Sequence, residues 1–278
     1  VTGRFSYSNP NLQQIPARNK DLGPMIRSLF LPEKDHKWGC FDYSQQEPRL
    51  VVHYAAETQP ICYDESVRNI VEKFKDDKVD FHQTVADMAN ISRTQAKTIN
   101  LGLFYGMGKT KLQAELGLSK KEDAENLFNQ YHENVPFVRD LMNYTSNQAQ
   151  QSGSIGTLLG RRCRFTKWEP NKFGMHKPME FEEAERTYGR GRIRRAFTYK
   201  ALNKLIQGSA ADMTKKAMLD LYKEGIIPHI QIHDELDISV KSDEEAKRII
   251  EIMENAVSLA VPNKVDYESG KTWGDIYG

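Results

Sequence analysis

Cysteine, long apolar runs and net charge are all scarce in this sequence of 278 residues. Its three cysteines are too few and too scattered for a disulfide scaffold, and none has the paired spacing of a zinc site. No run of eighteen apolar residues occurs, so the sequence predicts no membrane span and no membrane partner. The 39 Lys and Arg nearly balance the 38 Asp and Glu, and the net charge of +1 identifies no class of partner.

The sequence also lacks an initiator methionine and a secretion signal at Val1. We therefore expect a processed chain or a piece of a longer one, and a cytoplasmic rather than a secreted protein. Aromatic residues, in contrast, are plentiful: 12 Phe, 12 Tyr and 3 Trp can fill a core, which excludes a wholly disordered chain.

Apolar periodicity and capping residues predict a mostly helical chain with a few short strands. The expected strands cover 37–43, 229–233 and 236–240, with a Gly-flanked hairpin at 153–160. The expected helices cover 45–56, 92–104, 135–151, 195–224 and 242–260, and capping boxes mark helix starts at Ser92, Ser119 and Ser242. Residues 1–35 and 166–192 are expected to be irregular. The pattern predicts an α+β fold with a small antiparallel sheet.

Charge is unevenly distributed along the chain. Residues 160–204 contain 13 Lys and Arg against 5 Asp and Glu, so a basic block interrupts an otherwise acidic chain. Such a block is either a solvated charged loop or a surface that binds a polyanion.

Acidic residues lie where the expected strands end or join. Asp42 lies at the end of an apolar strand, where a carboxylate serves either as a helix N-cap or as a metal ligand. Asp234 and Glu235 lie together at a hairpin tip, as tolerated turn residues or as ligands of a divalent cation that relieves their repulsion. If the strands share a sheet, Asp42 and Asp234 can hold the pair of ions that phosphoryl transfer uses.

The helix expected at 92–104 carries two cations four residues apart, Arg93 and Lys97. Like charges at this spacing repel, and a cation in the first turn also opposes the helix dipole. This face is either solvated or binds an anion such as a triphosphate.

In their order along the chain, these motifs resemble the family A (DNA polymerase I-like) DNA polymerases. The matching segments are Thr2-Gly3-Arg4, 11–16, 42–45, Arg93 with Lys97, Tyr105-Gly106, 207–212 and 233–236. The stretch 159–165 is similar to phage members. The resemblance implies a right-hand palm at 1–50 and 191–278, helical fingers at 51–190, and no thumb within the chain.

The resemblance also implies a role for each matching position. The metal ligands would be Asp42, Asp234 and the backbone carbonyl of Tyr43, with Glu235 as an auxiliary carboxylate. Nucleotide-binding residues would be Arg93, Lys97, His82, Glu47, Leu101, Tyr105 and Gln45. DNA-binding residues would be Arg4, Arg49, Gly106, Asn203, Gln207 and His233. Among these, Lys97 would stabilise the leaving pyrophosphate, and Glu47 would occupy the space of a ribose 2′-hydroxyl.

The implied activity is template-directed addition of deoxynucleotides to a primer 3′ end, in replication or repair. It would use two Mg²⁺ ions, with Mn²⁺ as a substitute, and release pyrophosphate. The implied partners are primer–template DNA, dNTPs, and a thumb and an exonuclease domain from an upstream region, in a bacterial or phage-infected cytoplasm. Two positions depart from the family pattern: Leu101 replaces an aromatic residue, and Pro48 replaces an aliphatic one.

Three alternatives stay open. A single-subunit RNA polymerase or a reverse transcriptase would use a similar centre, although Glu47 argues against ribonucleotides. A non-catalytic DNA-binding module would not need both Asp42 and Asp234. A two-metal nuclease would explain the acids but not Arg93 and Lys97.

Overall fold

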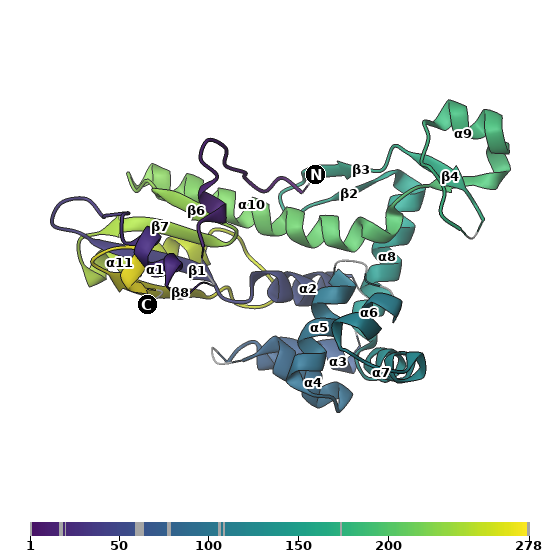
Figure 1. Cartoon of the computed structure of the whole chain (residues 1–278), viewed down its shortest axis with the longest axis horizontal. Coiled ribbons are helices and arrows are strands. Elements are labelled where there is room, and N and C mark those ends of the chain that lie inside the picture. Colours follow the sequence, from purple (N-terminus) through teal and green to yellow (C-terminus); the bar gives the residue numbers. More distant parts are fainter. Residues whose placement is uncertain are drawn as a thin grey trace. The chain divides into compact units, whose positions relative to one another are not determined.

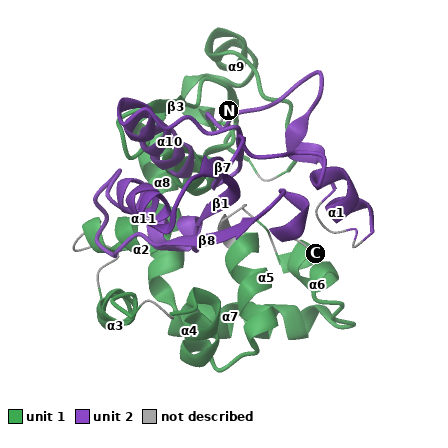
Figure 2. Cartoon of the chain, turned by 90° about the vertical axis from the view of Figure 1, so that its left-hand side faces the viewer, with its two compact units in different colours: residues 1–2, 51–209 green, residues 3–50, 210–278 purple. Residues whose placement is uncertain are grey.

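The computed structural model describes residues 2–16, 19, 21–58, 64–76, 79–104, 107, 109–172 and 174–276. The chain divides into two compact units (Figure 2). Unit 1 contains residues 1–2 and 51–209, and unit 2 contains residues 3–50 and 210–278. Unit 2 is therefore built from two segments that flank unit 1 in the sequence. The first boundary between the units, at 50/51, is the one expected from the sequence. The second lies at 209/210, whereas the sequence analysis placed it at 190/191.

Unit 2 is organised around a four-stranded sheet in the order β6-β7-β1-β8 (Figure 1). Its strands are β1 (Lys37–Tyr43), β6 (Ile230–Ile232), β7 (Glu235–Val240) and β8 (Val265–Gly270). All three pairings are antiparallel, which confirms the small antiparallel sheet expected from the sequence. The strand β1 lies between β7 and β8, so both of its edges are paired, and five of its seven residues are buried. The sequence analysis did not predict β8.

Helices and aromatic rings complete the core of unit 2. The helix α11 (Asp243–Glu254) contacts β7 and β8, and the short α1 (Leu22–Arg27) contacts a 3₁₀ turn at Gly274–Ile276. The rings of Trp38 and Trp273 stack with centroids 5.9 Å apart, and Phe30 meets Trp273 edge-on at 5.3 Å. The Arg27 guanidinium lies 4.3 Å from the Trp273 ring. These contacts anchor the C-terminal end of the described chain to its first strand.

Unit 1 is mainly helical. Its helices are α3 (Glu65–Lys73), α4 (Phe81–Ala89), α5 (Arg93–Phe104), α6 (Lys109–Glu115), α7 (Lys121–Asn134), α8 (Pro136–Ser152) and α9 (Phe181–Tyr188). Two further helices run across the unit boundary, α2 (Gln46–Glu57) and α10 (Ala201–Lys223). The division therefore falls within continuous helices and not in linkers. Among the described residues, no helix has the length and apolarity needed to cross a membrane.

Capping explains several helix starts. Ser92 Oγ accepts a hydrogen bond from Gln95 N at 3.2 Å, and Gln95 Oε1 accepts one from Ser92 N at 2.9 Å, so this capping box is confirmed. Ser242 Oγ likewise accepts from Glu245 N. The box predicted at Ser119 is wrong: α7 begins after Lys120, which makes no side-chain cap, so Ser119 lies one residue too early.

The segment expected to be irregular at 166–192 is instead folded. The strand β4 (Trp168–Pro170) pairs with β5 (Ile193–Arg195), and α9 lies between them in the chain. A second small hairpin joins β2 (Ser154–Gly156) to β3 (Arg162–Arg164), close to the expected one. Two predicted helix boundaries are also corrected. α10 starts at 201 because a turn precedes it, and α11 ends at 254 rather than near 260.

A buried histidine makes the stability of the chain depend on pH. His132 of α7 is 5% exposed, and its Nδ1 has no hydrogen-bond partner among the described residues. Burial, with smaller contributions from Arg139 and Lys109, lowers the pKa of His132 to about 4. The folded state thus binds fewer protons than the unfolded state between about pH 6.5 and 4, and the contribution of His132 to stability is lost as the pH falls through this range.

We expect His132→Leu to lose less stability on acidification than the wild type does, by on the order of 2–3 kcal/mol near pH 4. Urea unfolding of both proteins at several pH values measures this difference. His229→Gln, which changes an exposed histidine, is the control and should follow the wild type. Parallel pH profiles for His132→Leu and the wild type would contradict the assignment.

Candidate nucleotidyl-transfer site

The pairing of β1 with β7 brings the predicted acids together in unit 2. Asp42 is the cross-strand partner of Glu235, and Tyr43 N donates a hydrogen bond to Asp234 O at 3.3 Å. On its other side, Asp42 is the partner of Asp266 in β8. Three strands therefore place acidic residues at the same end of the sheet. Pairing of β1 with strands on both sides fixes this register, since a shift of one residue would turn every side chain of β1 to the opposite face of the sheet.

The charge of this acidic cluster is poorly compensated by protein groups. The pKa of Asp42 is raised to about 8, first by desolvation and then by Asp234, Glu235, Asp266 and Asp237. Asp42 retains an exposed surface, but the protein packed around its carboxyl reduces its solvation. Desolvation also raises the pKa of Asp234, an effect that Arg4 and His233 partly oppose. Such shifts mark a place where added positive charge would be stabilising.

Glu47 and Arg4 form an ion pair beside this cluster. Arg4 Nη2 lies 2.5 Å from Glu47 Oε1. Burial raises the pKa of Glu47, the Arg4 charge opposes that rise, and Asp234 adds to it, which places Glu47 within electrostatic reach of Asp234. His233 is exposed at the hairpin tip with φ +55°. The acids at the hairpin tip therefore lie near two basic side chains, Arg4 and His233.

The oxygen-rich donors of this cluster fit a hard divalent cation such as Mg²⁺, which binds one or two carboxylates and keeps sites for other oxygens. The Tyr43 ring is buried, and its hydroxyl donates to Met253 O at 2.6 Å, which fixes the backbone of this residue. Cys40, Glu235 and Asp237 form another group, with possible ligand atoms within 4.8 Å of one another. Its thiol suits Mg²⁺ poorly, and Asp237 Oδ1 already accepts hydrogen bonds from Trp38 and Cys40.

In unit 1 the predicted phosphate-binding residues gather on α4 and α5. Arg93 lies beside Asp80, with Nη2 to Oδ2 at 2.6 Å, and Asp80 also caps α4 through His82 N and Gln83 N. This ion pair joins α5 to the residue that caps α4, so the spacing of charges along α5 alone does not reveal it. Asp80 was missed, although an Asp directly before an apolar helix start is a capping signal.

His82 belongs to a buried hydrogen-bond chain. Its Nδ1 lies 3.1 Å from Asn100 Nδ2, and Tyr131 donates to Asn100 Oδ1 at 2.5 Å. Burial lowers the pKa of His82, and Lys97 and Arg93 add to this effect against Asp80. The neutral ring therefore accepts from Asn100, which fixes it against α5. Sequence analysis did not identify Asn100.

Lys97 and Leu101 occupy the exposed side of α5. Lys97 forms no ion pair with any residue that the structure describes, so its charge is available to an anion. Leu101 is 37% exposed, one turn further along. Tyr105 and Gly106, which were assigned to the nucleotide and the DNA, lie outside the described residues.

Asn203 and Gln207 lie four residues apart on α10, so their half-buried side chains share one face of the helix. The adjacent Gly208 permits close packing, because a Cβ there would lie 2.6 Å from Thr157 Cγ2. Arg161 donates to Gly208 O at 2.9 Å and to Thr2 O at 2.7 Å. These contacts fix the start of α10 within unit 1.

Arg49 is buried in unit 2 and is engaged by the backbone. Its Nε donates to Ser44 O at 2.8 Å, and its Nη1 donates to Pro262 O at 2.5 Å. With 2% of its surface exposed, Arg49 has no accessible guanidinium for DNA, so its predicted DNA contact is not supported.

The departure at Pro48 is tolerated by the fold. Pro48 falls in the first turn of α2, where its missing N–H is not needed by the helix. Gln45, which directly precedes this helix, adopts a positive φ of 54°.

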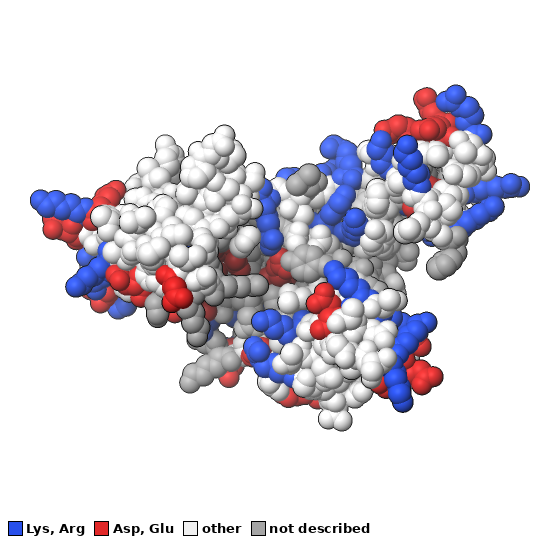
Figure 3. Space-filling view, in the orientation of Figure 1, with Lys and Arg blue, Asp and Glu red and all other residues white. Residues whose placement is uncertain are grey.

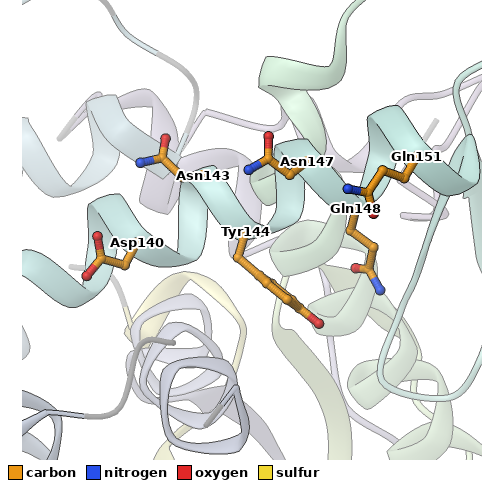
Figure 4. A pocket seen from close by; sticks show the side chains of 6 residues that line it. All are labelled: Asp140, Asn143, Tyr144, Asn147, Gln148 and Gln151. Carbon is orange, nitrogen blue, oxygen red and sulfur yellow. The ribbon is translucent and has the colours of Figure 1, made fainter. Parts of the chain in front are cut away.

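A polar hollow of about 620 Å³ follows α8 in unit 1 (Figure 4). Its lining residues all come from that helix: Asp140, Asn143, Tyr144, Asn147, Gln148 and Gln151. In the close-up, Asn143, Asn147 and Gln151 lie along one side of the helix, and Tyr144 and Gln148 point to the other. The hollow offers hydrogen-bonding groups and one carboxylate, without a nucleophile–base pair, and it contains none of the predicted site residues.

Comparisons with known proteins agree with this geometry. Residues 1–275 match DNA polymerase family A. A DNA-directed DNA polymerase of Pseudomonas phage M6 is 35% identical over 99% of this chain and 44% of its own length. The DNA polymerase I of Geobacillus stearothermophilus is 36% identical over 99% of this chain and 30% of its own.

A solved structure shares the fold. The POL domain of Pol1 from M. smegmatis, in complex with DNA primer-template and dNTP, has a TM-score of 0.78 and 29% identity. The match covers all of this chain and 47% of that one. The chain spans less than half the length of each of these relatives. The family match, the relatives and the shared fold together show that this chain belongs to DNA polymerase family A.

Proposed function

We propose that this chain carries the nucleotidyl-transfer centre of a template-directed DNA polymerase, which adds deoxynucleotides to a primer 3′ end and releases pyrophosphate. The observation that carries the proposal is the strand pairing that sets Asp42 beside Asp234 in a cluster of under-compensated acids. Family A polymerases are generally metal-dependent. Here Asp42, Asp234 and the Tyr43 carbonyl would hold two Mg²⁺ ions, with Glu235 nearby.

The bound ions would lower the pKa of the primer hydroxyl and neutralise the leaving phosphates. The protein residues would supply position and charge. Lys97, which is exposed and has no ion-pair partner in the described part of the chain, would contact the triphosphate and stabilise the negative charge that develops on the leaving pyrophosphate. Arg93 would share its charge between Asp80 and the phosphates, and the neutral His82 would donate a hydrogen bond to them.

The residues around the cluster would select the substrate. Glu47, held by Arg4, would occupy the space of a ribose 2′-hydroxyl and so favour deoxynucleotides. Asn203 and Gln207 would contact minor-groove acceptors, which correct base pairs share, and base identity would be set by pairing with the template. Leu101 offers no ring at the sugar-facing position, so contact with the sugar would be weaker than an aromatic side chain allows.

The proposal extends to partners and domains. Residues 1–50 and 191–278 would form the palm and residues 51–190 the fingers, acting on primer–template DNA in a bacterial or phage-infected cytoplasm. Because the relatives are more than twice as long as this chain, a thumb and an exonuclease domain would belong to the upstream region of the full-length protein.

Primer extension with Mg²⁺ tests the function. We expect template-dependent incorporation of dNTPs, and incorporation of rNTPs that is lower by about 10²-fold because of the Glu47 carboxylate. Omitting the template is the control and should abolish the product. Equal use of rNTPs would favour an RNA polymerase. Binding of primer–template without extension by either nucleotide set would favour a non-catalytic DNA-binding module.

A further inference from the structure

An aromatic turn precedes α10 in unit 1. Phe197 and Tyr199 are 38% and 54% exposed, whereas the small residues beside them, Ala196, Thr198 and Ala201, are buried. Burial would favour the reverse arrangement, because large apolar rings gain more from leaving water than small side chains do. The turn therefore presents its rings to solvent while its small residues pack inward.

Contacts with α8 hold the turn in this shape. Gln150 Nε2 donates to Arg195 O at 2.8 Å and to Thr198 Oγ1 at 3.2 Å, and Gln150 Oε1 accepts from Arg195 N at 2.9 Å. Phe197 consequently adopts φ +64°, ψ 12°, a left-handed conformation that is unfavourable for a bulky side chain and favourable for glycine. The turn itself does not require an aromatic residue at 197.

Cations surround the two rings. Lys200 Nζ lies 4.9 Å from the Phe197 ring centroid and 5.5 Å from that of Tyr199. Four residues further along the chain, in α10, Lys204 Nζ lies 4.1 Å from the Phe165 ring and donates to Arg164 O at 3.4 Å. Neither lysine forms an ion pair with the described residues.

The adjoining strand adds to this charge. Arg162 and Arg164 are exposed on one side of β3, and Cys163 between them is buried. Figure 3 shows Lys and Arg side chains in the part of the view where Figure 1 labels β3, and a mixture of basic and acidic side chains where it labels α9. The positive charge of the 160–204 block is thus carried on a folded surface and not on a loose loop.

We propose that Phe197 and Tyr199 form a stacking platform for unpaired bases of a DNA strand whose phosphates lie against Lys200, Lys204 and Arg164. Aromatic rings stack on bases of any identity, and interleaved cations follow the phosphate backbone. An inorganic anion would use the cations and leave the rings exposed, so the combination favours a polynucleotide. The inference rests on the proposed function, which supplies the strand: the unpaired template ahead of the primer terminus.

Two single strands of equal charge test the platform. One is a fluorescent oligodeoxythymidine, and the other has the same length and phosphates but abasic sugars throughout. For the whole chain we expect tighter binding of the strand that carries bases. Phe197→Gly and Tyr199→Ala should each weaken that binding by about tenfold, and leave the abasic strand unaffected. Lys204→Gln should weaken binding of both strands by a similar factor.

Stability measurements separate this role from a structural one. Glycine accommodates the positive φ at 197, so Phe197→Gly should leave the melting temperature unchanged or raise it while base-dependent binding falls. Tyr222→Ala removes a ring of 65% exposure elsewhere on α10 and is the control, with wild-type binding. The platform is refuted if the variants bind both strands like the wild type, if they lose both equally, or if the wild type does not prefer bases.

Primer extension on the same preparations distinguishes the two proposals. Extension by the wild type without a preference for the base-bearing strand refutes the platform and leaves the polymerase function standing. A base preference that depends on Phe197 and Tyr199, without extension, supports the platform and counts against the polymerase function.

Discussion

Replacing Asp234 by Asn is expected to reduce Mg²⁺-dependent primer extension by about 10³-fold, the scale of the several kcal/mol that a metal ion contributes to the transition state. The folded protein should not be weakened. The pKa of Asp234 is raised by burial, so its ionised form destabilises the folded state at neutral pH. Asn keeps the shape without the charge, and the melting temperature should therefore stay the same or rise.

The matched control for this variant is Asp266→Asn. Asp266 belongs to β8 and is the cross-strand partner of Asp42. Its side chain is exposed, and its Oδ1 lies 3.7 Å from Lys264 Nζ. It belongs to the same cluster without a predicted metal role, so its loss should change extension only slightly. Single-turnover extension rates and thermal melts of both variants give the comparison. If Asp234→Asn and Asp266→Asn reduced the extension rate equally, the cluster would act only through its total negative charge, and Asp234 would have no specific role.

Lys97→Ala is expected to produce the second large effect, a decrease of about 10²- to 10³-fold in the rate of nucleotide addition. The structure also predicts an order. Arg93 is already paired with Asp80, whereas Lys97 has no such partner among the described residues. Lys97→Ala should therefore cost more than Arg93→Ala.

Pre-steady-state incorporation of a single dNTP measures both the rate and the apparent nucleotide affinity. Lys121→Ala, at the exposed start of α7, serves as a control for the loss of one cation in unit 1 and should behave like the wild type. A larger loss for Arg93→Ala than for Lys97→Ala would show that the Asp80 pair opens fully when the nucleotide binds.

Much of the centre could be predicted because its determinants are local. The strands β1 and β7 are marked by short runs of mainly buried residues, and Asp42 and Asp234 lie at their ends. That Asp42 and Asp234 lie close together could also be inferred. Acids at two strand ends, in a chain that also carries a cationic helix, suggest a shared site for metal ions and phosphates. The strand β8 could not be predicted, because it lies at the edge of the sheet and only Val265 is buried. Its sequence therefore shows little of the apolar alternation that identifies a strand.

Contacts between distant segments could not be predicted from spacing. The pairing of Asp80 with Arg93 needs α4 and α5 side by side, and the burial of Arg49 depends on Pro262 from the far end of the chain. The outward turn at Phe197 likewise depends on Gln150 of α8. In each case tertiary packing, rather than local propensity, decides what the side chain does.

The central position of β1 has a consequence for synthesis and folding. This strand is synthesised before unit 1, whereas its neighbours β7 and β8 follow unit 1 in the chain. Until those segments emerge, β1 has no partner on either edge, and unit 1 has time to form first. A nascent or truncated product that stops short of β7 cannot assemble the acidic cluster, so it lacks the strand pairing on which the proposed nucleotidyl transfer depends.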